Sequence, residues 1–374
     1  MTTQGPGSST NFETHFSTLK DPRRITKGNI KYPLNEVLFL LISAVVSGCT
    51  ANTAIAEFGV LKIEWLRKYF PYTNGTPSHD VIGDLLSILD KKAFGNCFTN
   101  WVNAIASMVD SKVVALDGKT IRGVASNTRK YPIHIVTAFC VENRMSIAQQ
   151  SVGDKSNEIV AIPKLLETLA LKGCIVTIDA MGCQKKIATK IRERQADYIL
   201  QVKANQPELQ EQIKKVFNRN TQKIIDIVDD CGHGRIEKRT CEVIDNLTFL
   251  DGKEQWKDLK TIIKITSYIE DKKTGEYTTS ERHYISSLAA DAKLISRSIR
   301  DHWAIENNLH WNLDVIFKED YQLRRNKNAP ENFNMVAKIG LRLIEDEKSL
   351  KKTKPMKMLR AALSDSYREK ILKI

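Results

Sequence analysis

Apolar residues recur every three or four positions from Tyr32 to about Met108, which is the spacing of amphipathic helices. The clearest segments lie at 37–45, 58–66 and 81–89. This part of the chain is therefore predicted to be all-helical.

The pattern changes at Val113, where short apolar runs begin to alternate with helical segments. Up to about Leu209 the order reads as three strands, a helix, a strand, a helix, a strand and a helix. Such an order is typical of a mixed α/β layer structure. Between about 224 and 287 four strand-like segments follow without a helical period, and helical spacing resumes at about Asp291. We expect an α/β core with a β-rich insertion.

These changes of pattern predict four parts of the chain. They are a loose N-terminus at 1–22, a helical domain at 23–108, an α/β domain at 109–345 and a basic C-terminal tail at 346–374. The β-rich insertion falls within the α/β domain.

The composition is that of an ordinary soluble globular protein, with 42% hydrophobic and 27% charged residues among 374. The longest apolar run, Val37 to Gly48, is too short to cross a bilayer, and no charged segment with a cleavage site precedes it. Seven cysteines without a CxxC pair fit reduced thiols. A cytoplasmic protein without a membrane partner is expected.

Net charge changes the picture more than composition does. The chain has 57 basic against 44 acidic residues, which gives +13. Such an excess favours a polyanionic partner, of which nucleic acid is the commonest. Charge alone is equally compatible with a basic soluble protein that binds no polyanion.

Three acids are candidates for chemistry. Asp117 and Asp179 each end a predicted apolar strand, where α/β sheets build their sites. Glu306 falls on a largely apolar stripe of a predicted helix, with His302 and His310 one turn to either side. A carboxylate on such a stripe needs a partner, because burying an unpaired charge costs several kcal/mol.

Each acid also has a simpler interpretation. Asp117 and Gly118 form a common hairpin-turn pair, Asp179 could cap the following helix, and Glu306 could pair with a neighbouring histidine. If instead the three acids meet, they would suit divalent magnesium or manganese, which prefer oxygen ligands. Two such ions can activate a water or a 3′-hydroxyl against a phosphodiester.

A nucleotide-binding P-loop is excluded. Gly118, Lys119 and Thr120 match the end of that motif, but the glycine that must open it five positions earlier is replaced by Val113.

The chain resembles the ISAs-type insertion-sequence transposases, also called H-repeat-associated proteins. The resemblance runs from about Asp21 to Leu343. It is carried by the segments "ALDGKTIRG", "IVTIDAMGCQKKIA", "DYILQVKANQPEL", "GHGRIEKR", "HYISSL", "IRDHWAIENNLHWNLDVIFKED" and "NAPENFNMVAKIGLRL". The segment "TPSHDVIGDLLSILD" is similar to the N-terminal associated domain of that family.

The resemblance implies a DDE recombinase with a ribonuclease-H-like core that the β-rich insertion divides before the last acid. It places the metal-binding and catalytic triad at Asp117, Asp179 and Glu306, with magnesium as the cofactor. The implied partner is double-stranded DNA, both the terminal repeats of a mobile element and its target. The implied reaction is cleavage by water at the element ends, followed by strand transfer by the freed 3′-hydroxyl. A homo-oligomer is expected, because two element ends must be held.

One part of the wider DDE pattern is absent. Many insertion-sequence transposases carry Tyr, Arg and Lys around the glutamate, and here those positions are Ile299, His302 and Leu313. Basic residues near the acids are the predicted DNA contacts, although each by itself could be a solvated surface residue and each histidine a partner of Glu306. The set is Lys119, Arg122, Lys203, His302, His310, Arg324 and Arg325.

Two other functions remain open at this level. One is a metal-dependent nuclease that hydrolyses DNA without strand transfer. The other is a DNA-binding derivative of such an enzyme that has no catalytic activity.

Overall fold

The structure, a computed structural model, describes residues 15–23, 30–105, 113–124, 132–152, 157–219, 222–232 and 234–374. The chain forms two compact units. The helical unit comprises Met1–Ser107, Thr120–Ile135 and Leu309–Ile374, and the sheet unit comprises Met108–Lys119 and Val136–Asn308. The loose segment predicted at 1–22 lies largely outside the described residues.

The strands of the chain form one nine-stranded mixed sheet, in the order β3-β2-β1-β4-β5-β9-β8-β7-β6 among the described residues. The strands are β1 (Val113–Ile121), β2 (Ile133–Cys140), β3 (Met145–Ser151), β4 (Ile175–Ile178), β5 (Asp197–Val202), β6 (Ile224–Gly232), β7 (Arg235–Ile244), β8 (Thr261–Asp271) and β9 (Tyr277–Ser286). This confirms the α/β class predicted from the sequence.

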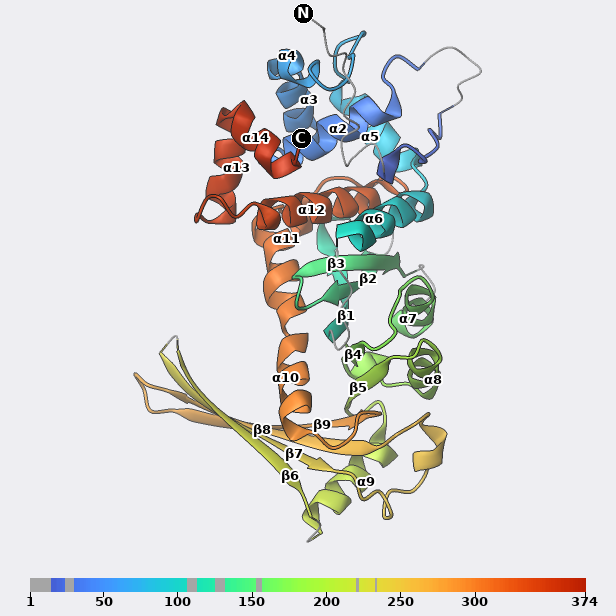
Figure 1. The fold of residues 1–374 in the computed structure, drawn as a ribbon, viewed down its shortest axis with the longest axis vertical. Helices are drawn as coiled ribbons and strands as arrows, with labels where there is room; N and C mark the ends of the chain where they lie inside the picture. The colour runs from blue at the N-terminus through green and yellow to red at the C-terminus, as the bar shows by residue number, and fades with distance from the viewer. Residues whose placement is uncertain are drawn as a thin grey trace, which may run out of the picture. The chain divides into compact units, whose positions relative to one another are not determined.

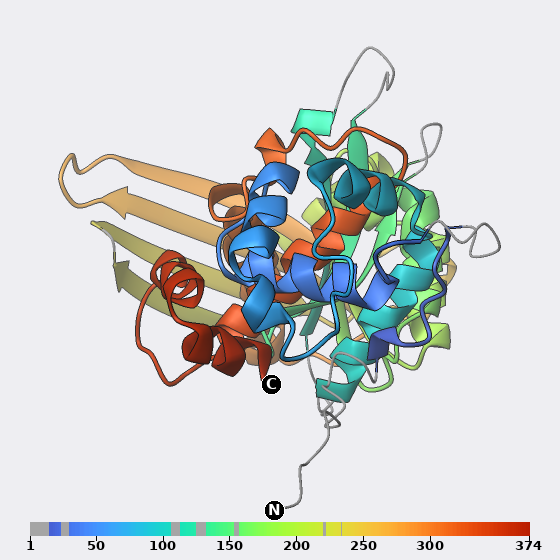
Figure 2. The same cartoon turned by 90° about the horizontal axis from the view of Figure 1, so that it is seen from above.

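The sheet has a parallel and an antiparallel part. β1, β4 and β5 run parallel to one another. The first four residues of β1, all of β4 and all but the first residue of β5 are buried, as expected of strands covered on both faces. The four strands β6 to β9 are antiparallel and join β5 through β9. They correspond to the strands predicted at 224–287, they extend the same sheet, and they project beyond α10 as a long ribbon (Figures 1 and 2).

Helices cover both faces of the parallel strands (Figure 1). α7 (Glu158–Glu167) and α8 (Lys185–Glu193) lie on one face and α10 (Ala292–His302) on the other, while α9 (Pro207–Asn218) follows β5. Asp291 caps α10 by accepting a hydrogen bond from the Leu294 N–H at 2.9 Å. The apolar side of α10 then packs on the sheet in a cluster of Ile175, Ile199, Cys241, Val243, Ile263, Ile265, Tyr284, Ala292, Ile295 and Ile299.

The helical unit is built around one long helix. α12 (Ala329–Asp346) packs against three N-terminal helices, α2 (Leu34–Val46), α5 (His79–Ile88) and α6 (Lys91–Ile105). The other helices of this unit are α3 (Asn52–Leu61), α4 (Ile63–Leu66), α11 (Trp311–Val315), α13 (Lys354–Leu363) and α14 (Asp365–Leu372). The N-terminal part is thus helical, as predicted.

Two sequence expectations concern this unit. The apolar run at Val37 forms the buried helix α2, and in the described part of the chain no helix is both long and apolar enough to cross a membrane. The segment predicted as a basic tail folds into α13 and α14, which pack against α2 and bury Tyr367 and Ile371.

Candidate active site

A pocket of about 140 Å³ in the sheet unit is lined by all three predicted acids, and we call it the acid pocket. Asp117 comes from β1, Asp179 from the end of β4, and Glu306 from the segment after α10. The pocket is lined by Asp117, Thr177, Ile178, Asp179, Ile199, Gln201, Lys203, Tyr284, Ile299, His302, Trp303 and Glu306.

Asp117 is placed by the parallel pairing of β1 with β4. That pairing ends at Leu116 opposite Ile178, so Asp117 in β1 and Asp179, the first residue after β4, come next along the two neighbouring segments. The predicted end of the strand at Asp117 was wrong, because β1 continues to Ile121. The alternative of a hairpin turn at Asp117 is also excluded, since the residue lies within a strand.

Asp179 caps the short 3-10 turn Ala180–Gly182, so the simpler interpretation of this residue holds alongside its place in the pocket. Its carboxylate accepts a hydrogen bond from the Met181 N–H at 3.1 Å. At Gly182 a Cβ atom would overlap the Ile178 side chain. Glycine is therefore needed for the turn to follow β4 so closely.

The loop after β5 holds this turn in place. The Asn205 side chain donates to the carbonyl of Ala180, and the Gln206 side chain donates to the carbonyl of Cys183 at 2.9 Å. Both donors belong to the sequence segment "KANQPEL". Their role is to fix the loop that carries Asp179.

The pKa of Asp179 is raised above its usual value. Burial is the main cause, and the negative charges of Glu158 and Asp117 add to it, while the N–H groups of Gly182 and Met181 act in the opposite direction. A charged Asp179 is thus disfavoured by the carboxylates around it, and a cation between them would reverse this preference.

Glu306 departs from the sequence prediction. It lies in a π-helical turn, Ile305–His310, and its side chain is exposed, whereas Ile305 and Leu309 are buried. The prediction of an apolar stripe assumed α-helical spacing throughout. The i to i+5 bonding of a π-turn changes that spacing, which takes Glu306 off the core-facing side.

His302 is held by the sheet. Its Nδ1 and the Thr177 Oγ1 share a hydrogen bond at 2.9 Å. Burial lowers the pKa of His302, and the charge of Asp117 acts against this. His302 lines the pocket beside Asp117 as a desolvated ring.

Several lining residues were not singled out from the sequence. Gln201 is the polar residue in the apolar strand β5, which was a usable signal. Trp303 is 38% exposed, and the guanidinium of Arg282 lies over its ring at 5.2 Å. Nothing in the local sequence connects Arg282 with Trp303, because β9 brings them together.

The predicted DNA contacts divide between the two units. Lys203 lines the acid pocket, and Lys119 lies on β1 two residues after Asp117. In the helical unit, Arg122 and Arg325 are exposed and His310 is half-buried. Arg122 lies 4.0 Å from the carboxylate of Asp320.

Arg324 is not a surface residue. It is 9% exposed, and its guanidinium donates to the Asn52 Oδ1 at 2.9 Å and to the Thr50 carbonyl at 2.6 Å. It also lies over the Phe333 ring at 3.5 Å. Arg324 therefore lies in a buried position and not on the open surface, and its predicted contact with DNA stays a prediction.

Among the described residues, no group of three or more His, Cys, Asp or Glu side chains is arranged closely enough to hold a metal ion. The donor chemistry nevertheless fits one class of ion. Three carboxylates line the same pocket, and carboxylate oxygens are the ligands that magnesium and manganese prefer.

Comparison with known proteins gives a family context. The sequence model of the family described as Transposase DDE domain matches residues 108–341. The one described as DDE_Tnp_1-associated matches residues 13–102. The chain is 39% identical to "Putative transposase YncI" of Escherichia coli O157:H7, over 96% of this chain and 93% of that protein. It is 36% identical to "H repeat-associated putative transposase YhhI" of Escherichia coli K12, over 96% of each chain.

Proposed function

This chain belongs to the transposase DDE domain family, and from that premise we propose that it cuts DNA at the ends of a mobile element and joins the freed ends to a target. Asp117, Asp179 and Glu306 are the proposed catalytic carboxylates. The α/β core around them is proposed to be of the ribonuclease-H type.

One observation carries this proposal. Residues separated by 62 and 127 positions along the chain (179 − 117 and 306 − 179) line one small pocket. They occur in the order strand, strand end and helical turn along the chain. The raised pKa of Asp179 supports a site in which negative charges are brought together for a purpose other than stability.

Asp117, Asp179 and Glu306 would hold magnesium or manganese. Bound there, such ions would supply activation of the attacking water or 3′-hydroxyl and charge stabilisation at the leaving oxygen of the phosphodiester. The side chain of Asp179 is oriented for this task by its cap on the Ala180–Gly182 turn. Thr177 orients the ring of His302 beside Asp117.

DNA would be held by basic residues next to this pocket. Lys203 is exposed at its edge, and Arg282 lies over Trp303 on another side of the lining. Lysine and arginine contacts to phosphates supply much of the affinity of such complexes and make it salt-dependent. The proposed assembly is a homo-oligomer on double-stranded DNA.

A cleavage and joining assay tests the function. Purified protein is incubated with magnesium or manganese, a labelled duplex that carries the element's terminal repeats, and an unlabelled target duplex. We expect joined products from the wild-type protein and none from Asp179→Asn. Nicks without joining would identify a nuclease, and retardation of the duplex without cleavage would identify a DNA-binding protein; either result would overturn the proposal.

A further inference from the structure

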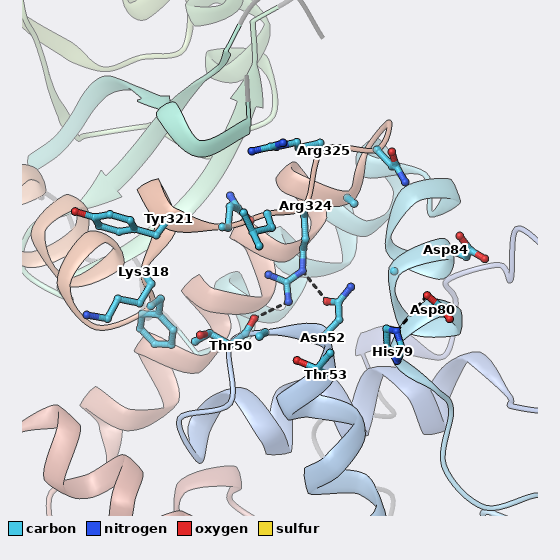
Figure 3. Close-up of a pocket in the computed structure, with 17 residues that line it drawn as sticks. Thr50, Asn52, Thr53, His79, Asp80, Asp84, Lys318, Tyr321, Arg324 and Arg325 are labelled. Atoms are coloured by element: carbon cyan, nitrogen blue, oxygen red, sulfur yellow. Dashed lines mark hydrogen bonds and ion pairs between the residues drawn. The ribbon is translucent and has the colours of Figure 1, made fainter. Parts of the chain in front are cut away.

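A second pocket, in the helical unit, has the opposite charge character. It has a volume of about 1000 Å³ and lies between the N-terminus of α3, the helix α5 and the loop before α12 (Figure 3). Its lining is Thr50, Ala51, Asn52, Thr53, His79, Asp80, Gly83, Asp84, Phe317, Lys318, Tyr321, Gln322, Leu323, Arg324, Arg325, Asn326 and Ala329. We call it the Arg324 groove.

Arg324 brings a buried positive charge into this groove. Both of its hydrogen-bond acceptors, the Asn52 amide oxygen and the Thr50 carbonyl, are neutral. Burial is the one cause that lowers its pKa, and no carboxylate of the described chain acts on it. A guanidinium in proteins stays protonated at neutral pH, so this site has a desolvated cation without a counter-charge. Such a cation is costly unless an anion accompanies it.

The N-terminus of α3 adds to the same electrostatic preference. The N-cap residue is Ala51, and within the described residues it provides no side-chain cap. The first N–H groups of a helix are not bonded within the helix, and its dipole favours negative charge there. Ala51, Asn52 and Thr53 all line the groove.

A buried side chain without a partner lies in the same lining. Gln322 is 7% exposed, and neither polar atom of its carboxamide has a hydrogen-bond partner in the described structure. Buried polar groups are normally paired, and one that is not needs an explanation. Its NH2 group is a donor of the kind that a ligand with several acceptor oxygens requires, whereas its Oε1 can only accept.

Charges at the rim locate the preferred end of the groove. Lys318 and Arg325 are exposed near Arg324, whereas the acidic residues Asp80 and Asp84 belong to α5, on the far side from Lys318 (Figure 3). The His79 ring lies 3.4 Å from Asp80. An anion would therefore bind at the end formed by Arg324 and α3.

We propose that Arg324 and the N-terminus of α3 form a phosphate-binding site in this groove. The phosphate belongs either to a DNA backbone or to a free nucleotide or inorganic phosphate, since the recognising chemistry is the same. Asp117, Asp179 and Glu306 do not line this groove.

Thermal unfolding of the full-length protein tests phosphate binding. Inorganic phosphate is titrated against chloride at constant ionic strength, and binding to the folded state raises Tm. We expect a phosphate-dependent rise in the wild type that is lost in Arg324→Gln and retained in Arg67→Gln. Arg67 is an exposed arginine of the same unit that does not line the groove, so its variant controls for net charge.

A second variant keeps the test valid if Arg324→Gln folds poorly. Ala51→Asp places a favoured N-cap on α3, so the protein should unfold at no lower temperature than the wild type without phosphate. Its own carboxylate would occupy the helix terminus and abolish the phosphate-dependent rise. An equal rise in all variants is a general salt effect, and that result, or no rise in the wild type, would overturn the proposal.

The source of the phosphate is found from binding to duplex DNA at several salt concentrations. If a backbone phosphate occupies the site, Arg324→Gln lowers the slope of log K against log salt by about 0.9, and Arg67→Gln leaves it unchanged. An unchanged slope in Arg324→Gln, with the phosphate-dependent rise in Tm lost, assigns the site to a free phosphate or nucleotide. Asp179→Asn should retain the phosphate response, which separates this inference from the proposed catalysis.

Discussion

The acid pocket of the sheet unit contains a buried carboxyl group, and the Arg324 groove of the helical unit contains a buried guanidinium. In both, burial disfavours the charged form of the side chain. In the first, burial and neighbouring carboxylates raise the pKa of Asp179. In the second, burial lowers the pKa of Arg324. Both shifts disfavour the charged form. We infer that each pocket suits a ligand of opposite charge, the proposed divalent cation in one and the proposed phosphate in the other.

A third site contains a buried charge that other groups of the protein stabilise. Glu347, in the helical unit, accepts hydrogen bonds from the Ser349 N–H at 2.7 Å and the Tyr367 hydroxyl at 2.7 Å. Lys357 lies 3.6 Å away. Burial acts to raise the pKa of Glu347, but these donors outweigh it and lower the pKa to about 2. The protein thus neutralises this carboxylate with its own groups.

The largest predicted effect follows from removing one charge of the acid pocket. Asp179→Asn retains a side-chain oxygen that can cap the Ala180–Gly182 turn, so the fold should persist. Loss of outer-shell partners of a metal site costs roughly 10–100-fold, so loss of a proposed ligand should reduce cleavage by more than about 100-fold. The measurement is the rate of metal-dependent cleavage, with duplex binding as the control. Cleavage at the wild-type rate would contradict the role of Asp179.

A smaller loss of cleavage activity is expected when the three acids are kept and a residue that positions the pocket lining is changed. Thr177→Val preserves shape but removes the hydroxyl that bonds His302, and Thr177 is only 2% exposed. As a residue that positions the lining, it should lower cleavage by about 10-fold to 100-fold. Thr177→Ser, which keeps the hydroxyl, should recover most of the rate. If Val and Ser variants are equally slow, the hydrogen bond has no part in the reaction.

The close packing of the turn after Asp179 should contribute to the free energy of unfolding. Gly182→Ala introduces a methyl group into the space of Ile178, and such overpacking costs about 1–3 kcal/mol. Urea unfolding measures the change. Gly232→Ala is the matched control, because among the described residues, its chain neighbours aside, no atom lies within 4 Å of the Cβ position there. Equal stability of the two variants would show that the turn has room to adjust.

Substitution of Glu347 should give the smallest effect, a change in the free energy of unfolding that depends on pH. The pKa of Glu347 is lower in the folded protein than its usual 4.5, so its contribution is complete above pH 4.5 and is lost as the pH falls towards 2. Glu347→Gln should lower the free energy of unfolding by about 1–2 kcal/mol at pH 7. The gap to wild type should narrow near pH 3 in urea unfolding. A gap that does not change with pH would contradict this account.

Two of the three acids of the acid pocket could be predicted to lie together, because each follows a predicted apolar strand and such strands pair in a sheet. Asp117 and Asp179 each follow an apolar run, and the parallel pairing of β1 with β4 makes them neighbours. Glu306 was selected because a carboxylate on an apolar stripe needs a partner, and the family resemblance then placed it in the triad. The exposure of Glu306 was not predictable, because the π-helical turn is not visible in residue spacing.

The Arg324 groove was beyond sequence reasoning for a different reason. Arg324 was selected as a basic residue near the glutamate, but its partners Asn52 and Thr50 lie more than 270 positions earlier. Its burial is a product of tertiary packing. The strands β6 to β9 were predicted as strands, yet their continuation of the sheet through β5 and β9 also depends on contacts distant in sequence.

Manganese binding in the absence of DNA tests the central claim most directly. Electron paramagnetic resonance counts free manganese during a titration of the wild-type protein, Asp179→Asn and Asp226→Asn, the last at a strand position outside the pocket. If Asp117, Asp179 and Glu306 hold the ions, the wild type and Asp226→Asn bind manganese alike, and Asp179→Asn binds it at least about tenfold more weakly. Equal binding by all three proteins would contradict the account.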